Sequence, residues 1–364
     1  MGEELLIGLM SGTSLDGVDA VLADFTAARP RVLAHAHLPF DDALRVELLA
    51  LCAPADNEIE RAALAGNRLA RIYAEGVAAV LTATGTAPGA IRAIGCHGQT
   101  VRHRPERGYT AQIGSAALLA ELTGIRVVAD FRARDVAAGG QGAPLAPAFH
   151  AAVFASAAED RAVLNLGGIA NLTGVPVSGD VTGFDCGPGN CLLDLWAQRH
   201  LGKPMDEGGA WAATGRVSAA LLAKFLAEPY FAAPPPKSTG RDLFGETWLL
   251  AKLSRGTPAA DVQRTLLELT ARTAADALRR LLPRAARLIV CGGGAKNSAL
   301  MARIAELAAP AAVESSARHG IEPERVEALA FAWLAKRALG EEAGNLPSVT
   351  GARGSRVLGA IYPR

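Results

Sequence analysis

Several segments of the sequence bring glycines together with polar side chains of the kind that bind phosphate. The first, GLMSGTSLDGVD at residues 8–19, offers serine and threonine hydroxyls beside backbone N–H groups that glycine leaves accessible. Its two carboxylates, Asp16 and Asp19, are able to hold Mg²⁺ directly or through water. The same residues also suit a polar hairpin tip that binds nothing. The GxxxxGK[ST] pattern of a Walker A loop is absent from the sequence.

Three later segments repeat this combination. Residues 165–171, NLGGIAN, form a Gly-Gly turn between two expected strands, and such turns are common without any ligand. In GFDCGPGN, residues 183–190, a strand is expected to end just before Asp185, which a stiff Gly-Pro-Gly turn then holds as a catalytic carboxylate or as an acceptor for backbone donors. In VCGGGAKN, residues 290–297, a strand, a glycine loop and a helix follow one another, which suits a nucleotide. Asn297 stands where the Rossmann fingerprint needs glycine, so an adenosine loop is favoured over a dinucleotide site.

Polar residues outside these loops complete the candidate site. His97 and Gln99 follow a strand in CHGQT, at the carboxyl end where ligands of α/β proteins gather, although a lone histidine is more often structural. Arg132 precedes a glycine- and amide-containing stretch at residues 139–145 that suits sugar or phosphate contacts. Glu327 lies on an apolar helix flank and needs a partner, either a structural arginine or a ligand hydroxyl.

These segments belong to two blocks of similar pattern. Each block begins with three short, β-branched or apolar runs bounded by turn residues, and continues into helices and parallel-type strands. We therefore expect an α/β protein of two like-built lobes, with a ligand cleft between them. Strands are expected at 5–10, 18–25, 31–38, 91–96, 126–128, 162–166, 169–173, 181–184 and 288–290, and helices at 41–51, 58–81, 115–122, 192–200, 218–226, 261–282, 299–307 and 324–339.

The stretch 132–147 separates the two blocks. It is rich in Gly and Pro and contains no periodic run long enough for a helix or strand. The N-terminal lobe is predicted to span residues 1–147, completed by the C-terminal segment 340–364. The C-terminal lobe is predicted to span 148–339 and to carry the nucleotide-binding loops.

Composition argues against several classes of partner. The 364 residues carry 37 Lys and Arg against 36 Asp and Glu, which gives no electrostatic case for nucleic acid or for an anionic membrane. The acidic start lacks the basic region of a signal peptide, and no apolar run approaches the roughly 20 residues that cross a bilayer. Five scattered cysteines form no ligand cluster, and their odd number fits a reducing compartment. We therefore expect a cytoplasmic protein without a membrane or nucleic-acid partner.

Taken together, the motifs resemble those of the anhydro-N-acetylmuramic acid kinase family over nearly the whole chain. The resemblance implies a two-lobed actin-like ATPase (ribonuclease H-like) fold of the actin/hexokinase/chaperone-ATPase group, with a central ligand cleft. It also implies ATP and Mg²⁺ as cofactors, 1,6-anhydro-N-acetylmuramic acid as substrate, and a homodimer. The matching segments, in the family's order, are GLMSGTSLDGVDA, GCHGQTV, DFRARDVAAGGQGAPLAP, NLGGIANLT, GFDCGPGN, CGGGAKN and NLPSVTGA.

The same resemblance implies roles for individual residues. Asp185 matches the catalytic aspartate, and His97, Arg132 and Glu327 match positions that line the sugar pocket. Gln99, from the same strand end as His97, is predicted to bind the substrate with them. Asp16 and Asp19 are the implied metal residues. The implied ATP-binding residues are Ser11, Gly12, Thr13, Ser14, Leu15, Asp16, Gly17, Val18, Asp19, Asn165, Gly167, Gly168, Gly292, Gly293, Gly294 and Asn297.

One departure from the family stands beside the catalytic position. The family commonly has threonine after the aspartate, and this chain has Cys186. Both side chains are small, so we expect tolerance, although the missing hydroxyl would alter how Asp185 is oriented.

The family's reaction hydrolyses the 1,6-anhydro bond and phosphorylates O6, giving N-acetylmuramic acid 6-phosphate and ADP in cell-wall recycling. By this resemblance Asp185 would take the proton from the water that attacks C1, as the base of an inverting glycosidase does. Two alternatives stay open. A different sugar or polyol kinase of the same fold would use Asp185 on a substrate hydroxyl, and a nucleotide-dependent sensor or chaperone-like ATPase would phosphorylate no sugar. A dehydrogenase is least favoured, because its glycine fingerprint is missing.

Overall fold

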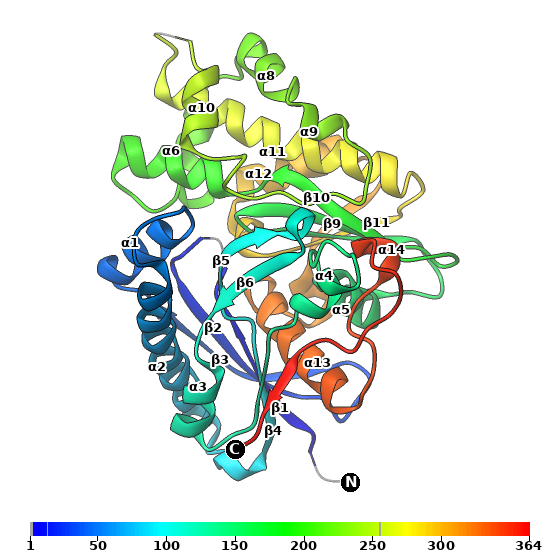
Figure 1. The fold of residues 1–364 in the computed structure, drawn as a ribbon. Helices are drawn as coiled ribbons and strands as arrows, with labels where there is room; N and C mark the ends of the chain where they lie inside the picture. The colour runs from blue at the N-terminus through cyan, green and yellow to red at the C-terminus, as the bar shows by residue number, and fades with distance from the viewer. Residues whose placement is uncertain (1–2, 13, 255) are drawn as a thin grey trace. The chain divides into compact units, whose positions relative to one another are not determined.

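The computed structural model describes residues 3–12, 14–254 and 256–364, and the chain divides into two compact units (Figure 1). Unit 1 consists of Met1–Val153 together with Arg325–Arg364, and unit 2 is the continuous segment Phe154–Glu324. The first unit is therefore built from both ends of the chain, with the second unit inserted between them.

Unit 1 contains a six-stranded sheet in the order β13-β7-β4-β1-β2-β3. β1, β2 and β3 form an antiparallel meander, and β4 and β7 continue the sheet parallel to β1. A separate antiparallel ribbon is made by β5 and β6. The strands are β1 Leu5–Met10, β2 Gly17–Asp24, β3 Arg31–Pro39, β4 Ile91–Cys96, β5 Gln99–Arg104, β6 Tyr109–Ile113, β7 Val127–Ala129 and β13 Ala360–Tyr362.

Helices cover both faces of this sheet. α2 packs on one face of the sheet, against β2 and β3, and there Gly76 lies close to the Ala20 side chain. α13 packs on β1 and β4 on the other face, and there a Cβ on Gly8 or Gly95 would overlap a carbonyl oxygen of α13. Two glycines therefore let the α13 backbone lie directly on the strands. The helices of unit 1 are α1 Asp42–Leu51, α2 Glu58–Thr84, α3 Ala116–Thr123, α4 Ala133–Ala137, α13 Val326–Leu339 and α14 Pro347–Thr350, while α5 Ala146–Phe154 reaches the unit boundary.

Unit 2 repeats the sheet of unit 1. Its five strands follow the order β10-β9-β8-β11-β12, with β8, β9 and β10 antiparallel and with β11 and β12 parallel to β8. Position for position, this is the β3-β2-β1-β4-β7 order of unit 1. The strands are β8 Arg161–Leu166, β9 Ile169–Val175, β10 Thr182–Pro188, β11 Arg287–Cys291 and β12 Ala312–Ser315.

The long helix α11 packs across β9 and β10 and is itself surrounded by α6, α7, α8 and α12. Its buried face is apolar over most of its length, and Glu268, the buried carboxylate on it, pairs with Arg272 and Arg303. The helices of unit 2 are α6 Cys191–Leu201, α7 Ala210–Thr214, α8 Ala219–Leu226, α9 Pro229–Ala232, α10 Glu246–Lys252, α11 Ala259–Leu281 and α12 Ser298–Ala308.

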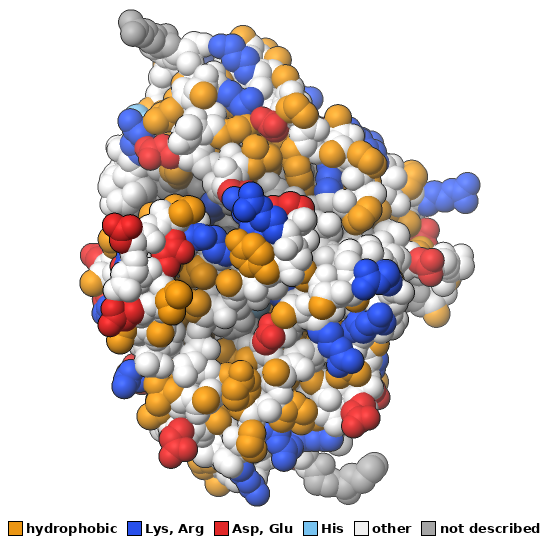
Figure 2. All heavy atoms as spheres, viewed as in Figure 1, with side chains coloured by type: hydrophobic (Ala, Val, Ile, Leu, Met, Phe, Trp, Pro, Cys, Tyr) orange, Lys and Arg blue, Asp and Glu red, His pale blue; other side chains and the backbone are white. Residues whose placement is uncertain are grey.

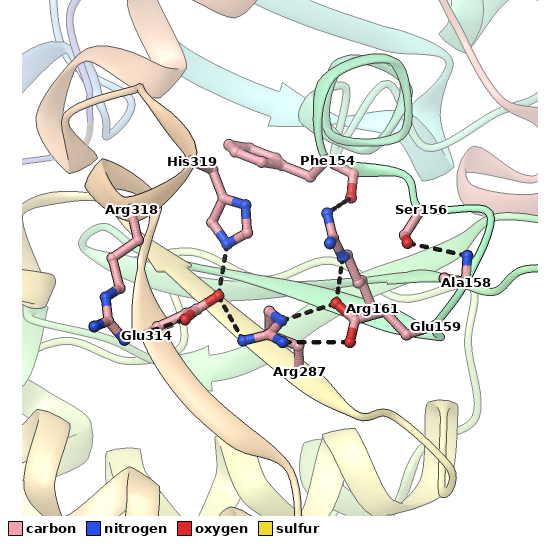
Figure 3. A network of polar contacts seen from close by, with 9 residues as sticks. All are labelled: Phe154, Ser156, Ala158, Glu159, Arg161, Arg287, Glu314, Arg318 and His319. Carbon is pink, nitrogen blue, oxygen red and sulfur yellow. Dashed lines mark hydrogen bonds and ion pairs between the residues drawn. The ribbon is translucent and has the colours of Figure 1, made fainter.

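Ion pairs link three strands of unit 2 at the amino ends of β8 and β11 (Figure 3). Arg287 bridges Glu159 at 2.8 Å and Glu314 at 3.0 Å, and Arg161 also pairs with Glu159 at 2.8 Å. The hydrogen bonds from Arg287 and then Arg161 lower the pKa of Glu159 to about 2. His319 reaches Glu314 at 2.7 Å, so the network extends from β8 across β11 to β12.

The fold class predicted from the sequence is confirmed to the extent that the chain is α/β and that each of its two compact units contains the same mixed sheet. The expected strands at 5–10, 91–96 and 162–166 match β1, β4 and β8 closely. The stretch 132–147 was expected to hold no element, but it contains the five-residue helix α4 and the start of α5. These elements were missed because so short a run within the stretch shows no helical period in the sequence.

The division of the chain also differs from the predicted one. Residues 148–339 were grouped as one lobe, whereas α13 lies in unit 1, because its apolar face is buried on β1 and β4. The hairpin β5–β6 was not expected at all.

No helix of the described residues is long and apolar enough to span a membrane. On the face drawn in Figure 2, basic and acidic side chains are interspersed with apolar ones. This view agrees with the nearly balanced charge of the sequence, 37 basic against 36 acidic residues.

Candidate active site

In unit 1 the turn after β1 is tied to the end of β4. The Ser11 hydroxyl donates to the Gly98 carbonyl at 3.1 Å and shares a hydrogen bond with the Tyr73 hydroxyl at 2.8 Å. Ser11 is buried, so its side chain fixes the turn after β1. Thr13 of the same predicted loop lies outside the described residues.

His97 links this loop to Arg132. Its Nε2 accepts from the Arg132 guanidinium at 3.1 and 3.0 Å, and its Nδ1 donates to the Ser11 carbonyl at 3.3 Å. Because arginine is only a donor, these partners fix the neutral Nδ1–H tautomer. Burial, and then the Arg132 charge, lower the pKa of His97 to about 3. His97 is therefore an uncharged connector at neutral pH.

The Arg132 guanidinium also donates to the Gly142 carbonyl at 2.7 Å. Gly142 in turn donates its N–H to Asp135 at 2.8 Å, and the other Asp135 oxygen accepts from Asn345 at 2.7 Å and from Thr350 at 2.8 Å. Asp135 is fully buried, so this carboxylate holds the loop at 139–142 against the late NLPSVT segment. The loop sets the position of Arg132.

Gln99 also faces the first loop. Its Nε2 donates to the Gly12 carbonyl at 3.2 Å, while its Oε1 is buried and has no hydrogen-bond partner among the described residues. Buried side-chain oxygens are rarely left unpaired, so Oε1 is an acceptor suited to a ligand hydroxyl or amide.

The two carboxylates of the first loop have different surroundings. Asp16 is exposed and accepts a hydrogen bond from Ser14. Asp19 accepts from His35 at 2.9 Å and from His37 at 3.1 Å, both on β3. Although burial acts to raise it, the pKa of Asp19 is lowered by the hydrogen bonds from these two histidines.

The surroundings of Asp16 and Asp19 bear on which of these carboxylates suits Mg²⁺. Mg²⁺ bound with phosphates takes one or two carboxylates, phosphate oxygens and water. Asp16, exposed, fits that donor set, whereas Asp19 is already engaged by two histidines. Among the described residues no group of three or more His, Cys, Asp or Glu side chains is arranged to hold a metal by itself.

Glu327 lies in the first turn of α13, next to Ala328, the residue that contacts Gly8 of β1. It is half-buried, and the buried apolar run that packs on the sheet begins at the next residue, Ala328. The close approach of α13 to β1 therefore places Glu327 at a fixed position on this face of unit 1.

In unit 2 three glycine loops pack on one another. The turn Gly167–Gly168 accepts backbone hydrogen bonds from Gly189 at 3.0 Å and Asn190 at 2.9 Å, and the Asn190 amide donates to Leu166 at 3.0 Å. Any Cβ on Gly189 would overlap the Gly167 carbonyl. The Asn190 side chain makes no hydrogen bond that caps α6, and it joins the loops instead.

The third loop follows β11. A Cβ on Gly292 would come within 2.5 Å of the Asn165 side-chain oxygen, and one on Gly294 within 2.6 Å of Leu166. The backbone of this loop therefore lies against the end of β8, which leads into the turn Gly167–Gly168. Backbone N–H groups of both loops lie at the carboxyl ends of the strands. Asn297 caps α12 by accepting from Leu300 N at 3.0 Å.

Asp185 lies within β10 and not after its end, because the strand continues to Pro188. The expected end before Asp185 was wrong: a β-bulge between Asp185 and Gly187 lets pairing with β9 resume past Cys186. Bulges commonly redirect a functional side chain. Asp185 is buried, and its Oδ2 accepts from the Thr239 N–H at 3.0 Å.

Asp185 is the end of a row that crosses the sheet. In register it faces Asn171 of β9, which faces Asn165 of β8, which faces Cys291 of β11. Residues directly opposite one another project to the same face, so the row aligns the Asp185 carboxylate with the strand ends that lead into the loops at 167–168 and 292–294. The Asn171 side-chain oxygen is buried without a hydrogen-bond partner among the described residues.

Sequence reasoning did not assign roles to several residues around these groups. Asn171, Tyr230, Lys237 and Thr239 surround Asp185, and no glycine motif marks the last three. The sequence offered one signal for them, the Pro-rich stretch that ends at Lys237. The irregular segment that begins there lies beside β10, where the Asp185 N–H donates to the Lys237 carbonyl.

Comparison with known proteins bears on both units. A family model described as anhydro-N-acetylmuramic acid kinase matches residues 4–364. The anhydro-N-acetylmuramic acid kinase of Variovorax paradoxus (strain S110) is 59% identical and covers 100% of each chain. That of Cupriavidus pinatubonensis (strain JMP 134 / LMG 1197) is 58% identical, covering 98% of each chain.

Two solved structures are also similar. The activator of the 2-hydroxyisocaproyl-CoA dehydratase from Clostridium difficile with bound ADPNP is 14% identical, with a TM-score of 0.48, over 93% of this chain and 97% of that chain. A ROK family glucokinase from Streptomyces griseus in complex with glucose and AMPPNP is 16% identical, with a TM-score of 0.44, over 92% and 99%.

Proposed function

This chain belongs to the anhydro-N-acetylmuramic acid kinase family, and we propose that Asp185 is the base of its reaction with 1,6-anhydro-N-acetylmuramic acid. The chain is an ATP-using phosphotransferase of peptidoglycan recycling. The observation that carries the proposed base is its setting: a buried carboxylate on a β-bulge, in one row with the glycine loops of unit 2.

The proposed reaction joins two substitutions, one at C1 of the sugar and one at the γ-phosphorus of ATP. Water attacks C1 of the sugar, its proton passes to Asp185, and the C1–O6 bond breaks with its electron pair going to O6. O6 bonds to the γ-phosphorus of ATP while the bond from that phosphorus to the bridging oxygen of ADP breaks. The products are N-acetylmuramic acid 6-phosphate and ADP, and Asp185 then returns its proton to solvent.

Backbone N–H groups are proposed to donate to phosphate oxygens of the nucleotide, in unit 1 from residues 11–12 and 14–17 and in unit 2 from the loops at 167–168 and 293–294. The Gly292 N–H already donates to the Pro323 carbonyl at 2.9 Å. Mg²⁺, which neutralises charge on transferring phosphates, would be held by Asp16. Its exposed carboxylate supports this choice over Asp19. The Asn297 side chain is engaged as a helix cap, which favours a backbone role for that position.

The sugar is proposed to contact His97, Gln99, Arg132 and Glu327. The buried, unpartnered Oε1 of Gln99 supports this, because it suits a hydroxyl or N-acetyl N–H donor. Arg132, held by His97 and Gly142, supplies a positive charge that suits the carboxylate of a muramic acid. We place the reaction in the cytoplasm, where ATP is available, and expect a homodimer, which analytical ultracentrifugation would test.

The substrate part of the proposal separates it from another sugar kinase of this fold. The purified enzyme is given ATP with the 1,6-anhydro sugar, free N-acetylmuramic acid or free glucose. We expect phosphorylated product from the anhydro sugar and at least about 100-fold less from the others, which lack the bond whose opening generates the nucleophile. Preferred turnover of a free sugar would contradict the proposal, and tight ATP binding with no phosphorylated sugar would favour a sensor.

A further inference from the structure

A closed set of hydrogen bonds surrounds Asp185. The Tyr230 hydroxyl donates to the Asp185 carbonyl oxygen at 2.7 Å, and the Lys237 ammonium donates to the Tyr230 carbonyl at 2.9 Å. The Asp185 N–H donates to the Lys237 carbonyl at 3.3 Å, which closes the ring. Thr239, two residues on, donates its N–H to the carboxylate itself at 3.0 Å.

The ring binds the backbone of Asp185, and the Thr239 N–H binds its side chain. The backbone at a β-bulge is not fixed by the regular ladder, because Cys186 has no partner on β9. The irregular segment at 237–239 makes up for that loss by binding the N–H and the carboxylate of Asp185 directly. The orientation of the Asp185 carboxylate therefore depends on the position of the segment at 237–239.

Lys237 fixes the segment in place. Its ammonium donates to the carbonyls of Tyr230 and Phe231, and it lies over the Tyr230 ring at 4.6 Å and the Phe184 ring at 5.3 Å. The Phe231 ring packs against Gly187, where a Cβ would approach it to 2.6 Å. A charge held among aromatic faces and carbonyls leaves few alternative positions for the side chain.

We propose that Lys237 and Tyr230 are positioning residues for the catalytic base, with Lys237 also supplying a positive charge that favours the ionised form of the Asp185 carboxylate. The inference rests on the proposed function of Asp185. Neither residue is assigned contact with the sugar or the nucleotide. Their action is through the backbone of β10, the segment at 237–239 and the electrostatic field at the carboxylate.

The charges around Asp185 give the sign of the pH effect. Cys186 and Tyr230 face it, and burial raises the pKa of both, so they are neutral near pH 7. The cations described in this group include Lys237 and, beyond it, Arg280, which donates to the Phe231 carbonyl at 3.0 Å. Burial lowers the pKa of Lys237 from 10.5. Removing the Lys237 charge disfavours the ionised carboxylate, so the pKa of the base rises.

The test compares Lys237→Met, Lys237→Arg and Tyr230→Phe with the wild type and with Asp185→Asn. The control is Lys252→Met, which removes another ammonium of unit 2 that lies over an aromatic ring, 4.8 Å from the Trp248 centroid. Steady-state turnover of the anhydro sugar with ATP is measured between pH 5 and 9, with KM for both substrates.

We expect Lys237→Met to lower kcat about 100-fold, the loss typical of a reacting group displaced by about 1 Å, with both KM values within about threefold. The acid limb of its kcat/KM profile moves to higher pH, because that limb reports the base of the free enzyme. Lys237→Arg keeps the charge and restores the position of the limb. Tyr230→Phe lowers kcat about tenfold without moving the limb, and the control behaves as wild type.

Two outcomes are distinguished. Unchanged kcat and an unchanged acid limb in Lys237→Met, while Asp185→Asn abolishes turnover, would overturn this inference and leave the proposed base intact. Turnover that survives in Asp185→Asn would instead remove the proposed function. If Lys237→Met does not fold, Tyr230→Phe, which loses a single hydroxyl, decides the question through kcat alone.

Discussion

Replacing Asp135 by asparagine is expected to destabilise unit 1 while leaving the shape of the side chain unchanged. The carboxylate is fully buried and accepts three hydrogen bonds, two at Oδ1 from Asn345 and Thr350 and one at Oδ2 from the Gly142 N–H. An asparagine keeps an oxygen for the first two donors. Its amide nitrogen then faces the Gly142 N–H, and two donors cannot bond each other.

The magnitude follows from these contacts. One hydrogen bond to a charged acceptor is lost, at about 1.5–3 kcal/mol, and the buried Gly142 N–H is left unpaired. Because the two losses share one contact and are not additive, we expect a decrease of about 3 kcal/mol in the free energy of unfolding. The Gly142 carbonyl also holds Arg132, so KM for the sugar should rise several-fold as well.

The assay is urea unfolding followed by circular dichroism, with hydrogen exchange of the segments at 139–142 and 345–352 to locate the effect. Asp56→Asn, at an exposed position, is the matched control and should change stability by less than about 0.5 kcal/mol. A loss below about 1 kcal/mol in Asp135→Asn, or unchanged exchange in both segments, would refute this account of the buried carboxylate.

Three further predictions concern the frame of the site. Gly95→Ala should cost about 3 kcal/mol, because its Cβ would overlap the Phe331 carbonyl of α13, whereas Gly89→Ala, with open space around it, should be nearly neutral; thermal unfolding compares them. His150 is buried with its pKa lowered to about 3, so the unfolded chain takes up a proton first as the pH falls below about 6.5, and stability drops by up to about 1.4 kcal/mol per pH unit for this group. That slope, measured by urea unfolding at pH 6 and pH 5, should be smaller in His150→Gln; an equal slope would count against it. Asn297→Ala should lose about 1 kcal/mol as a helix cap is removed, and Asn297→Ser should recover most of it.

The strands that carry the loops are predictable from sequence, because each is a short apolar run ended by Gly, Ser or Asp. β1 and β8 were expected at their observed positions for this reason. No local run of residues encodes the order in which the strands pair. The packing of α13 in unit 1 is not encoded locally either. That packing depends on Gly8 and Gly95, whose effect appears only when the helix from the far end of the chain packs on them.

The candidate residues were found because glycines mark the loops, but their partners were not. The link from Ser11 through His97 to Arg132 joins residues 86 and 35 positions apart in sequence, and no motif spans them. The bulge that extends β10 past Asp185 also has no local signature, since Cys186 fits either a strand or a turn. Such features arise from tertiary packing, which overrides local preference.

The central claim is tested most directly by turnover of 1,6-anhydro-N-acetylmuramic acid with ATP, comparing the wild type with Asp185→Asn, while ATP binding is measured by calorimetry. The account predicts phosphorylated sugar from the wild type, a loss of at least about 1000-fold in kcat for the variant, and ATP affinity that is unchanged within about threefold. Substantial turnover by Asp185→Asn would contradict it, because no proton acceptor would then be needed at that position.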